Sequence, residues 1–213
     1  MSDDRKQTSA TAISRRDFLK GAGAAVAGMT ASEAGVATIT AAVAAEPKPP
    51  STVGDAVRLE VNVNGTARSV VVEPSTTLAE FLREDLGLIG TKIACDRGAC
   101  SACTVWLDGK AIASCMLLAI DAAGRDVTTI EGLAPPDALH PVQESFIAHD
   151  ALQCGFCTPG LVMSCAALLE HNAHPSRDEV EKAISGHLCR CGSLPHVVDA
   201  TLAAAQAGKK AGQ

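Results

Sequence analysis

The sequence predicts an α+β fold built in two successive domains: strands and one helix over residues 56–130, and helices alone over residues 131–207. Two observations predict it. Before residue 130 apolar residues tend to alternate with polar ones, as in half-buried strands, whereas after it they recur at helical spacing. Eight of the nine cysteines also fall into two sets of four, one set in each of these regions. Each predicted domain therefore carries its own group of thiols.

The chain begins with a segment that has the composition of an export signal. Ser14–Lys20 (SRRDFLK) matches the twin-arginine pattern, and an Ala- and Gly-rich stretch with a small-residue cleavage site follows as far as Ala45. A membrane-spanning helix is the alternative, but it needs about 20 strongly apolar residues, and this stretch is rich in Ala, Gly and Thr with Glu33 inside it. We therefore predict a twin-arginine signal peptide over residues 1–45, periplasmic export, and no membrane span in the mature chain. Residues 46–55 are Pro-rich and are predicted to be a linker.

Strand signals open the first domain. Residues 58–63 alternate polar and apolar, Asn64-Gly65 is a type I′ hairpin signal, and residues 69–73 provide the returning strand. Thr77 and Glu80 then have the spacing of a capping box, which predicts the start of a short amphipathic helix. The segment is therefore expected to form a hairpin followed by a helix.

More strands follow the cysteine-rich loop at residues 90–103. Residues 104–107 and 111–115 are predicted strands joined by an Asp108-Gly109 turn, and residues 126–130 are a last predicted strand. The order of strand, strand, helix, loop and further strands suits a β-grasp, ferredoxin-like sheet with one helix packed across it.

The second domain is predicted to hold four helices with short connections. They cover residues 141–149, 159–171, 176–185 and 195–207. The spacing of Ser176 and Glu179 predicts a capping box at the start of the third. Four helices joined in this way suit a small antiparallel four-helix bundle, and residues 208–213 form a tail after it.

The first set of cysteines has the spacing C-x4-C-x2-C-x11-C. It consists of Cys95, Cys100, Cys103 and Cys115. This spacing in a loop of small residues is the plant-type pattern that binds a [2Fe–2S] cluster. Small side chains let backbone N–H groups approach the sulfurs, where they stabilise the negative charge of such a cluster. Arg97 lies in the same loop. Its positive side chain is either a solvated surface charge or helps to neutralise the negative charge of the cluster.

The second set of cysteines is spaced C-x2-C and then C-x-C. It consists of Cys154, Cys157, Cys189 and Cys191. Each pair precedes a predicted helix, whose positive dipole end favours thiolates and anionic clusters. The same four thiols are compatible with a structural zinc site, and disulfides stay open for pairs other than Cys189 with Cys191, which are too close in sequence. Cys165, the ninth, is predicted to be a buried core thiol on an apolar helix face.

Composition excludes one class of partner. Aromatic residues make up only 2% of the chain, with no Tyr and a single Trp, and the formal net charge is −6. Binding of nucleic acid needs aromatic stacking platforms and a basic surface. We therefore predict no nucleic-acid partner.

Three motifs together resemble a known family. They are residues 90–100 (GTKIACDRGAC), 153–160 (QCGFCTPG) and 187–192 (HLCRCG). This combination resembles the small iron–sulfur subunits of the molybdenum hydroxylases, the xanthine dehydrogenase and aldehyde oxidase family, over residues 57–205. The signal peptide and residues 128–133 (TTIEGL) look most like the iron–sulfur subunits of periplasmic aldehyde oxidoreductases.

The resemblance implies an electron-transfer subunit with no catalytic residue of its own. The first cysteine set would hold a plant-type [2Fe–2S] cluster nearer a flavin, and the second set would hold another [2Fe–2S] cluster nearer molybdenum. Gln153 would contact the pterin of the molybdopterin cofactor. The implied partners are a large molybdopterin-binding subunit, where substrate is oxidised, and a medium FAD-binding subunit. An aldehyde is the favoured substrate, and an N-heterocycle such as a purine, isoquinoline or nicotinate is the alternative.

The chain departs from the family pattern in three places, one of which is residues 193–196 (SLPH), where the sequence after the last cysteine differs from the commoner one. Ser101 stands where glycine is usual, and His187 stands where asparagine is usual. We predict that His187 is a water-exposed loop histidine rather than a proton relay. Two rival functions remain beside the family interpretation: a free-standing ferredoxin-type shuttle, and a zinc-stapled periplasmic binding module without redox activity.

Overall fold

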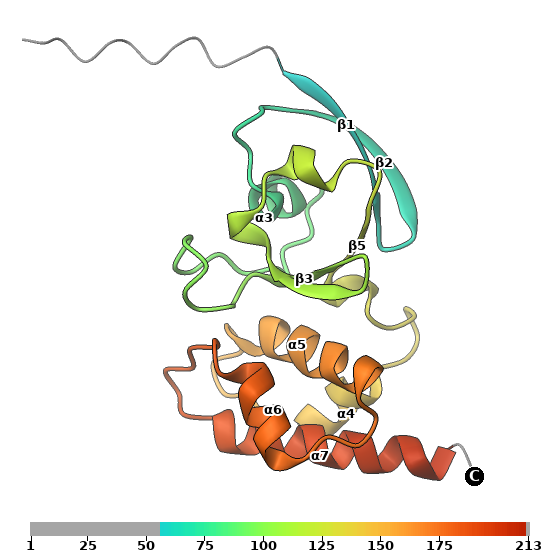
Figure 1. Ribbon diagram of the computed structural model, residues 1–213, viewed down its shortest axis with the longest axis vertical. Coiled ribbons are helices and arrows are strands. Elements are labelled where there is room, and N and C mark those ends of the chain that lie inside the picture. Colours follow the sequence, from blue (N-terminus) through green and yellow to red (C-terminus); the bar gives the residue numbers. More distant parts are fainter. Residues whose placement is uncertain (1–55, 212–213) are drawn as a thin grey trace, which may run out of the picture. The chain divides into compact units, whose positions relative to one another are not determined.

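The computed structural model describes residues 56–211, with side chains as far as residue 207 (Figure 1). The predicted signal peptide and linker lie outside the described residues, as does the very end of the predicted tail. The described residues belong to one compact unit. Within it the α+β prediction is confirmed at the level of a mixed sheet followed by helices.

The first two strands form the predicted hairpin. Strand β1 (Val57–Val63) pairs antiparallel with β2 (Thr66–Val72). Asn64 and Gly65 at the turn have φ values of +52° and +73°, and a type I′ turn requires positive φ at both central residues. The hairpin prediction is therefore confirmed, including its turn type.

Three further strands complete a five-stranded mixed sheet. They are β3 (Thr104–Leu107), β4 (Lys110–Ala113) and β5 (Asp126–Thr128). The strand order is β2-β1-β5-β3-β4, in which β1 and β5 are parallel and the other neighbours antiparallel. The last strand in sequence therefore lies in the middle of the sheet and joins the two hairpins.

The helix of the first half is shorter and more irregular than predicted. Thr77 caps it as expected: the Glu80 N–H donates to Thr77 Oγ1 at 3.2 Å, and Glu80 Oε2 accepts from the Thr77 N–H at 2.8 Å. Helix α3 spans only Leu78–Glu80 and continues as a wider π-helical turn, η1 (Phe81–Asp85). Apolar side chains of this segment enter a core with the inward residues of the sheet.

Two predicted strands end earlier than expected. The strand predicted at 111–115 stops at Ala113, because the next residues form a 3-10 turn, η2 (Ser114–Met116). In that turn the Ser114 hydroxyl donates to the Cys103 carbonyl at 2.6 Å. The strand predicted at 126–130 stops at Thr128, and a 3-10 turn, η4 (Ile130–Gly132), follows. A third 3-10 turn, η3, spans Ala119–Ala122.

Four helices make up the second half, as predicted. They are α4 (Pro141–Ala148), α5 (Thr158–His171), α6 (Arg177–Ile184) and α7 (Leu194–Ala211). The predicted capping box at Ser176 and Glu179 opens α6. Helix α7 runs on to Ala211, beyond the predicted end at residue 207. All four contribute to one apolar core, which is separate from the core of the sheet.

Helix α5 connects the two halves. It runs alongside β3 (Figure 1), and the Trp106 indole N–H donates to the Met163 carbonyl at 2.8 Å. Trp106 and Ile130 also pack against the helical core. Over residues 56–211, none of the helices has the length and apolar character that crossing a membrane would require.

Candidate metal centres

All nine cysteines lie in the described region and all are free thiols, so the structure contains no disulfide among them. The first set is carried by the loop before β3 and by the turn η2. Positive φ values at Asp96 (+51°), Gly98 (+71°) and Ser101 (+57°) bend this loop sharply. The bends turn backbone N–H groups inward: Ala99 donates to Cys95 Sγ at 3.2 Å and Gly98 to Cys115 Sγ at 3.3 Å.

The thiols of the first set lie in two contacting pairs. The Cys100 thiol is close enough to act on the pKa of Cys95, and the Cys103 thiol is close enough to act on that of Cys115. The Arg97 backbone N–H, with the Cys100 thiol, lowers the pKa of Cys95 to about 7. Burial raises the pKa of Cys115 to about 11. The set therefore combines one thiol that ionises readily with one that stays protonated until a metal displaces its proton.

The second set is built at the starts of α5 and α7. Cys157 is the N-cap residue of α5, while Cys189 and Cys191 lie in the loop just before α7. These thiols also form two contacting pairs, Cys154 with Cys191 and Cys157 with Cys189. Both pairs therefore join the start of α5 to the loop before α7, as the sequence prediction required.

The thiols of the second set differ in the same way as those of the first. Burial raises the pKa of Cys157 to about 12, whereas the Phe156 N–H lowers that of Cys154. Burial also acts on Cys189, but hydrogen bonds from Ser193 outweigh it and bring the pKa to about 7. The Ser193 hydroxyl lies 3.1 Å from Cys189 Sγ. Sequence reasoning missed this serine, although its place directly before a helix is one where hydroxyl side chains often bond.

The paired arrangement fits a two-iron group. A structural zinc site would bind one ion with three or four such ligands. A [2Fe–2S] cluster needs four thiolates shared between two irons. Two adjacent thiol pairs, with backbone N–H groups aimed at the sulfurs, suit that requirement in each set.

The other predicted site residues lie around these sets. Gln153 is exposed at the edge of the second set, beside the exposed Cys154. Two large apolar side chains nearby, Leu152 and Phe156, are also exposed. The Arg97 side chain is exposed, and its backbone N–H rather than its charge contacts Cys95.

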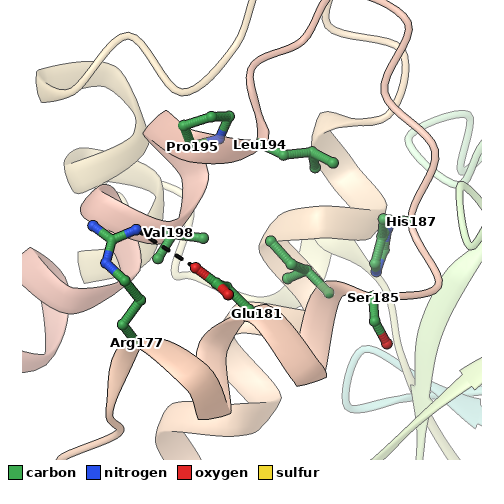
Figure 2. A pocket seen from close by; sticks show the side chains of 8 residues that line it. Arg177, Glu181, Ser185, His187, Leu194, Pro195 and Val198 are labelled. Atoms are coloured by element: carbon green, nitrogen blue, oxygen red, sulfur yellow. Dashed lines mark ion pairs between the residues drawn. The ribbon is translucent and has the colours of Figure 1, made fainter.

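The prediction for His187 is wrong. Its side chain is only 4% exposed, because it folds inward from the loop and its Nε2 lies 2.8 Å from the Ser164 hydroxyl of α5. Its Nδ1 is buried without a hydrogen-bond partner among the described residues. Burial lowers the pKa of His187 to about 4, so the neutral ring is the stable form at neutral pH. Figure 2 shows His187 at one side of a pocket between α6 and α7.

That pocket contains an ion pair, and no cysteine is among the residues that line it. Arg177 and Glu181, both on α6, are 3.7 Å apart (Figure 2). Arg177 also pairs with Asp199 of α7. Such exposed ion pairs contribute about 0–1 kcal/mol to stability, so the Arg177–Asp199 pair is a minor part of the packing of α6 against α7.

The prediction of a buried Cys165 is confirmed. The thiol is 0% exposed in the helical core, and burial raises its pKa to about 11. We expect iodoacetamide at pH 8 to leave Cys165 unmodified in the folded protein, because both the thiolate and access are lacking. Peptide mass spectrometry after labelling measures this, with a sample unfolded in guanidinium as the control. Labelling of Cys165 in the folded protein at pH 8 would contradict its burial.

The two cysteine-bearing regions touch each other. The Leu188 N–H donates to the Cys100 carbonyl at 3.2 Å, and the Ser101 hydroxyl donates to the Gly186 carbonyl at 3.2 Å. Gly160, in the first turn of α5, lies so close that a Cβ there would be 2.4 Å from the Ser101 carbonyl oxygen. Sequence reasoning found none of these contacts, since they join residues far apart in the chain.

Comparison with known proteins agrees with this geometry. The family of 2Fe-2S iron-sulfur cluster binding domains matches residues 61–127, and the [2Fe-2S] binding domain family matches residues 129–202. The twin-arginine translocation pathway signal sequence matches residues 12–32. The nicotine 6-hydroxylase small subunit of Paenarthrobacter nicotinovorans is 48% identical over 159 residues, which cover 74% of this chain and 96% of the relative. This chain belongs to the iron–sulfur subunits of the molybdenum hydroxylases.

Further members of the molybdenum hydroxylases support the assignment. The iron–sulfur-binding subunit PaoA of the Escherichia coli (strain K12) aldehyde oxidoreductase is 40% identical over 207 residues, covering 88% of this chain and 86% of PaoA. Quinoline 2-oxidoreductase from Pseudomonas putida 86 has a chain of the same fold, with a TM-score of 0.70 and 43% identity, covering 74% of this chain and 98% of that one. Aldehyde oxidoreductase from Desulfovibrio desulfuricans matches with a TM-score of 0.69 and 42% identity, covering 72% of this chain and 17% of that longer one. The chain is thus the non-catalytic iron–sulfur subunit of a molybdenum-dependent oxidoreductase.

Proposed function

We propose that this subunit passes electrons from a molybdopterin centre, held by a large partner subunit, through two [2Fe–2S] clusters to FAD on a medium partner subunit or to another acceptor. The observation that carries the proposal is the arrangement of eight thiols as two sets of two contacting pairs. Each bound cluster would supply reversible one-electron redox capacity. The work of the chain itself is to bind, orient and tune these groups.

The proposed ligands are the eight cysteines of the two sets. Cys95, Cys100, Cys103 and Cys115 hold the first cluster, nearer the flavin. Cys154, Cys157, Cys189 and Cys191 hold the second, nearer molybdenum. Backbone N–H groups of Gly98 and Ala99 donate to sulfurs of the first set, and the Ser193 hydroxyl contacts a sulfur of the second. Hydrogen bonds to sulfur stabilise the negative charge and so raise the reduction potential.

The second set faces the molybdopterin-bearing partner in this proposal. Gln153 contacts the pterin, and its exposure beside Cys154 leaves its amide available for that contact. Leu152, Phe156 and Leu188 are 39%, 46% and 66% exposed. Apolar side chains of this size on the surface suit burial against another subunit. The four-helix bundle predicted for α4–α7 would then serve as the rigid support of this face, and the common core of the four helices favours that architecture.

The proposed substrate of the assembled enzyme is an aldehyde. The similarity to the aldehyde oxidoreductase subunit PaoA extends over 88% of this chain. The sequence motifs and the twin-arginine signal also favour a periplasmic enzyme of that kind. An N-heterocycle is the second candidate, because the nicotine 6-hydroxylase small subunit is 48% identical. Assays of the purified complex with benzaldehyde and with nicotinate separate the two, and fractionation of the source cells tests the periplasmic location.

Metal analysis and spectroscopy of the purified complex test the electron-transfer role. We expect about four irons and four acid-labile sulfides for each copy of this chain, and two distinct EPR signals after reduction with dithionite. We also expect larger subunits with bound molybdopterin and FAD to co-purify. A colourless preparation with zinc and no labile sulfide would support the zinc-stapled module instead. Elution of the chain alone, with both clusters intact, would support a free-standing shuttle.

A further inference from the structure

The two cysteine-bearing regions are held together by a small set of contacts around Ser101. Ser101 follows Cys100 directly, and its hydroxyl donates to Gly186, three residues before Cys189. Nearby, one residue before Ser101 and two residues after Gly186, the Leu188 N–H donates to the Cys100 carbonyl. The two hydrogen bonds are each 3.2 Å long and join residues that are 85 or more positions apart in sequence.

Ser101 has a backbone conformation that glycine would adopt with less strain. Its φ is +57°, in the left-handed region that strains an L-residue and that glycine adopts freely. Glycine is also the usual residue here in the family pattern. The serine therefore keeps a strained backbone and contributes a hydroxyl that a glycine would lack, and that hydroxyl bonds to the opposite loop.

The loop on the other side is anchored by the second departure from the family pattern. His187 lies between Gly186 and Leu188, which take part in the two hydrogen bonds. The His187 ring hydrogen bonds to the Ser164 hydroxyl of α5. The backbone N–H of His187 donates to the Ile184 carbonyl at 2.9 Å. Because the loop is fixed to α5 and α6, the Ser101 hydroxyl meets a carbonyl that is already held in place.

We propose that Ser101 is a positioning residue whose hydroxyl docks the loop before Cys189 onto the loop after Cys95, and so keeps the Leu188-to-Cys100 hydrogen bond formed as the bridge for electron transfer between the two metal centres. This inference rests on the proposed function, which supplies the two clusters. The bridge runs from Cys189 through the Leu188 N–H to the carbonyl of Cys100, a proposed ligand of the other cluster. With both clusters bound, this bridge would carry one electron at a time, which would oxidise the donor cluster by one electron and reduce the acceptor cluster by one, with no bond broken and no proton moved.

The test compares Ser101→Ala and Ser101→Gly with a matched control, Ser185→Ala, in the complete complex. The Ser185 hydroxyl also donates to a backbone carbonyl, that of Lys182 at 2.8 Å, and lies one residue from Gly186, but it does not bridge the two loops. Hydrogen–deuterium exchange with mass spectrometry reports the Leu188 amide in peptides that cover residues 185–190. Low-temperature EPR of the fully reduced complex reports the magnetic interaction between the two centres, and flash reduction reports the electron-transfer rate between them.

Loss of one neutral hydrogen bond shifts the docked-to-undocked equilibrium by about 2- to 10-fold. We expect Leu188 exchange to accelerate by about that factor in both Ser101 variants, with a weaker spin–spin interaction and a slower transfer rate between the centres. The Ser185→Ala variant should match the wild type, and the iron content should be unchanged in all three. Wild-type behaviour of both Ser101 variants would overturn the inference and leave the proposed function standing. Absence of two clusters in the wild type would instead overturn the proposed function.

Discussion

Replacing Cys100 or Cys189 with Ser is expected to remove one cluster and spare the other. Each variant should retain about two of the four irons and one of the two EPR signals, because a neutral hydroxyl replaces one thiolate of a contacting pair. Cys100 belongs to the first set and Cys189 to the second, so the two variants should lose different signals. Electron transfer from substrate to acceptor should fall below detection in both, since either loss interrupts the chain of carriers.

Cys165→Ala is the matched control for these variants. It removes a thiol from the same chain, and Cys165 lies in the helical core rather than in either set. We expect full iron content, both EPR signals, and a modest loss of stability, about 1 kcal/mol, from the small cavity. Iron analysis and EPR of the purified Cys100→Ser, Cys189→Ser and Cys165→Ala complexes show which clusters each variant retains. Loss of both signals from a single Cys→Ser variant would show that the two sets do not bind clusters independently.

Gly160→Ala is expected to destabilise the contact between the sheet half and the helical half. Alanine normally stabilises a helix relative to glycine by about 1 kcal/mol, but here the new methyl would lie 2.4 Å from the Ser101 carbonyl oxygen and about 3.1 Å from that of Ala102. Both are backbone atoms of the first cysteine loop, so a side-chain rotation cannot relieve the clash. We expect a net loss of about 1–3 kcal/mol, which for a domain of this size lowers the melting temperature by about 2–4 °C per kcal/mol.

Circular dichroism with parallel visible absorbance measures the melting of this variant. Gly186→Ala is the comparison, because its methyl would meet only the side-chain oxygen of Ser101, at 3.1 Å, and should cost less. We also expect visible absorbance of Gly160→Ala to bleach at the lower temperature, since α5 begins at the second cysteine set. A melting temperature at or above that of the wild type would show that the loop moves aside without cost.

Local signals predicted much of the fold. The Asn64-Gly65 turn and the capping boxes at Thr77 and Ser176 were confirmed, because each depends on residues within four positions of one another. The proposed ligand sets were also named from spacing alone, and the structure brings the members of each set together.

Tertiary contacts account for what the sequence did not predict. His187 looks like a polar loop residue, and only the fold reveals that Ser164 of a neighbouring helix accommodates its ring. The strand before Cys115 ends early because the Ser114 hydroxyl and N–H both bond to the Cys103 carbonyl, eleven residues away. The shared contact of Ser101, Gly186 and Gly160 likewise depends on three segments that meet only after folding.

The bond from the Trp106 indole to Met163 has a practical consequence. The chain contains no other tryptophan, and this one lies where β3 meets α5. Intrinsic tryptophan fluorescence therefore comes from one residue, at the contact between the sheet half and the helical half. A red shift of that emission in the iron-free chain would show that Trp106 has become exposed to water, because the contact between β3 and α5 has been lost. This could occur even while each half keeps its secondary structure.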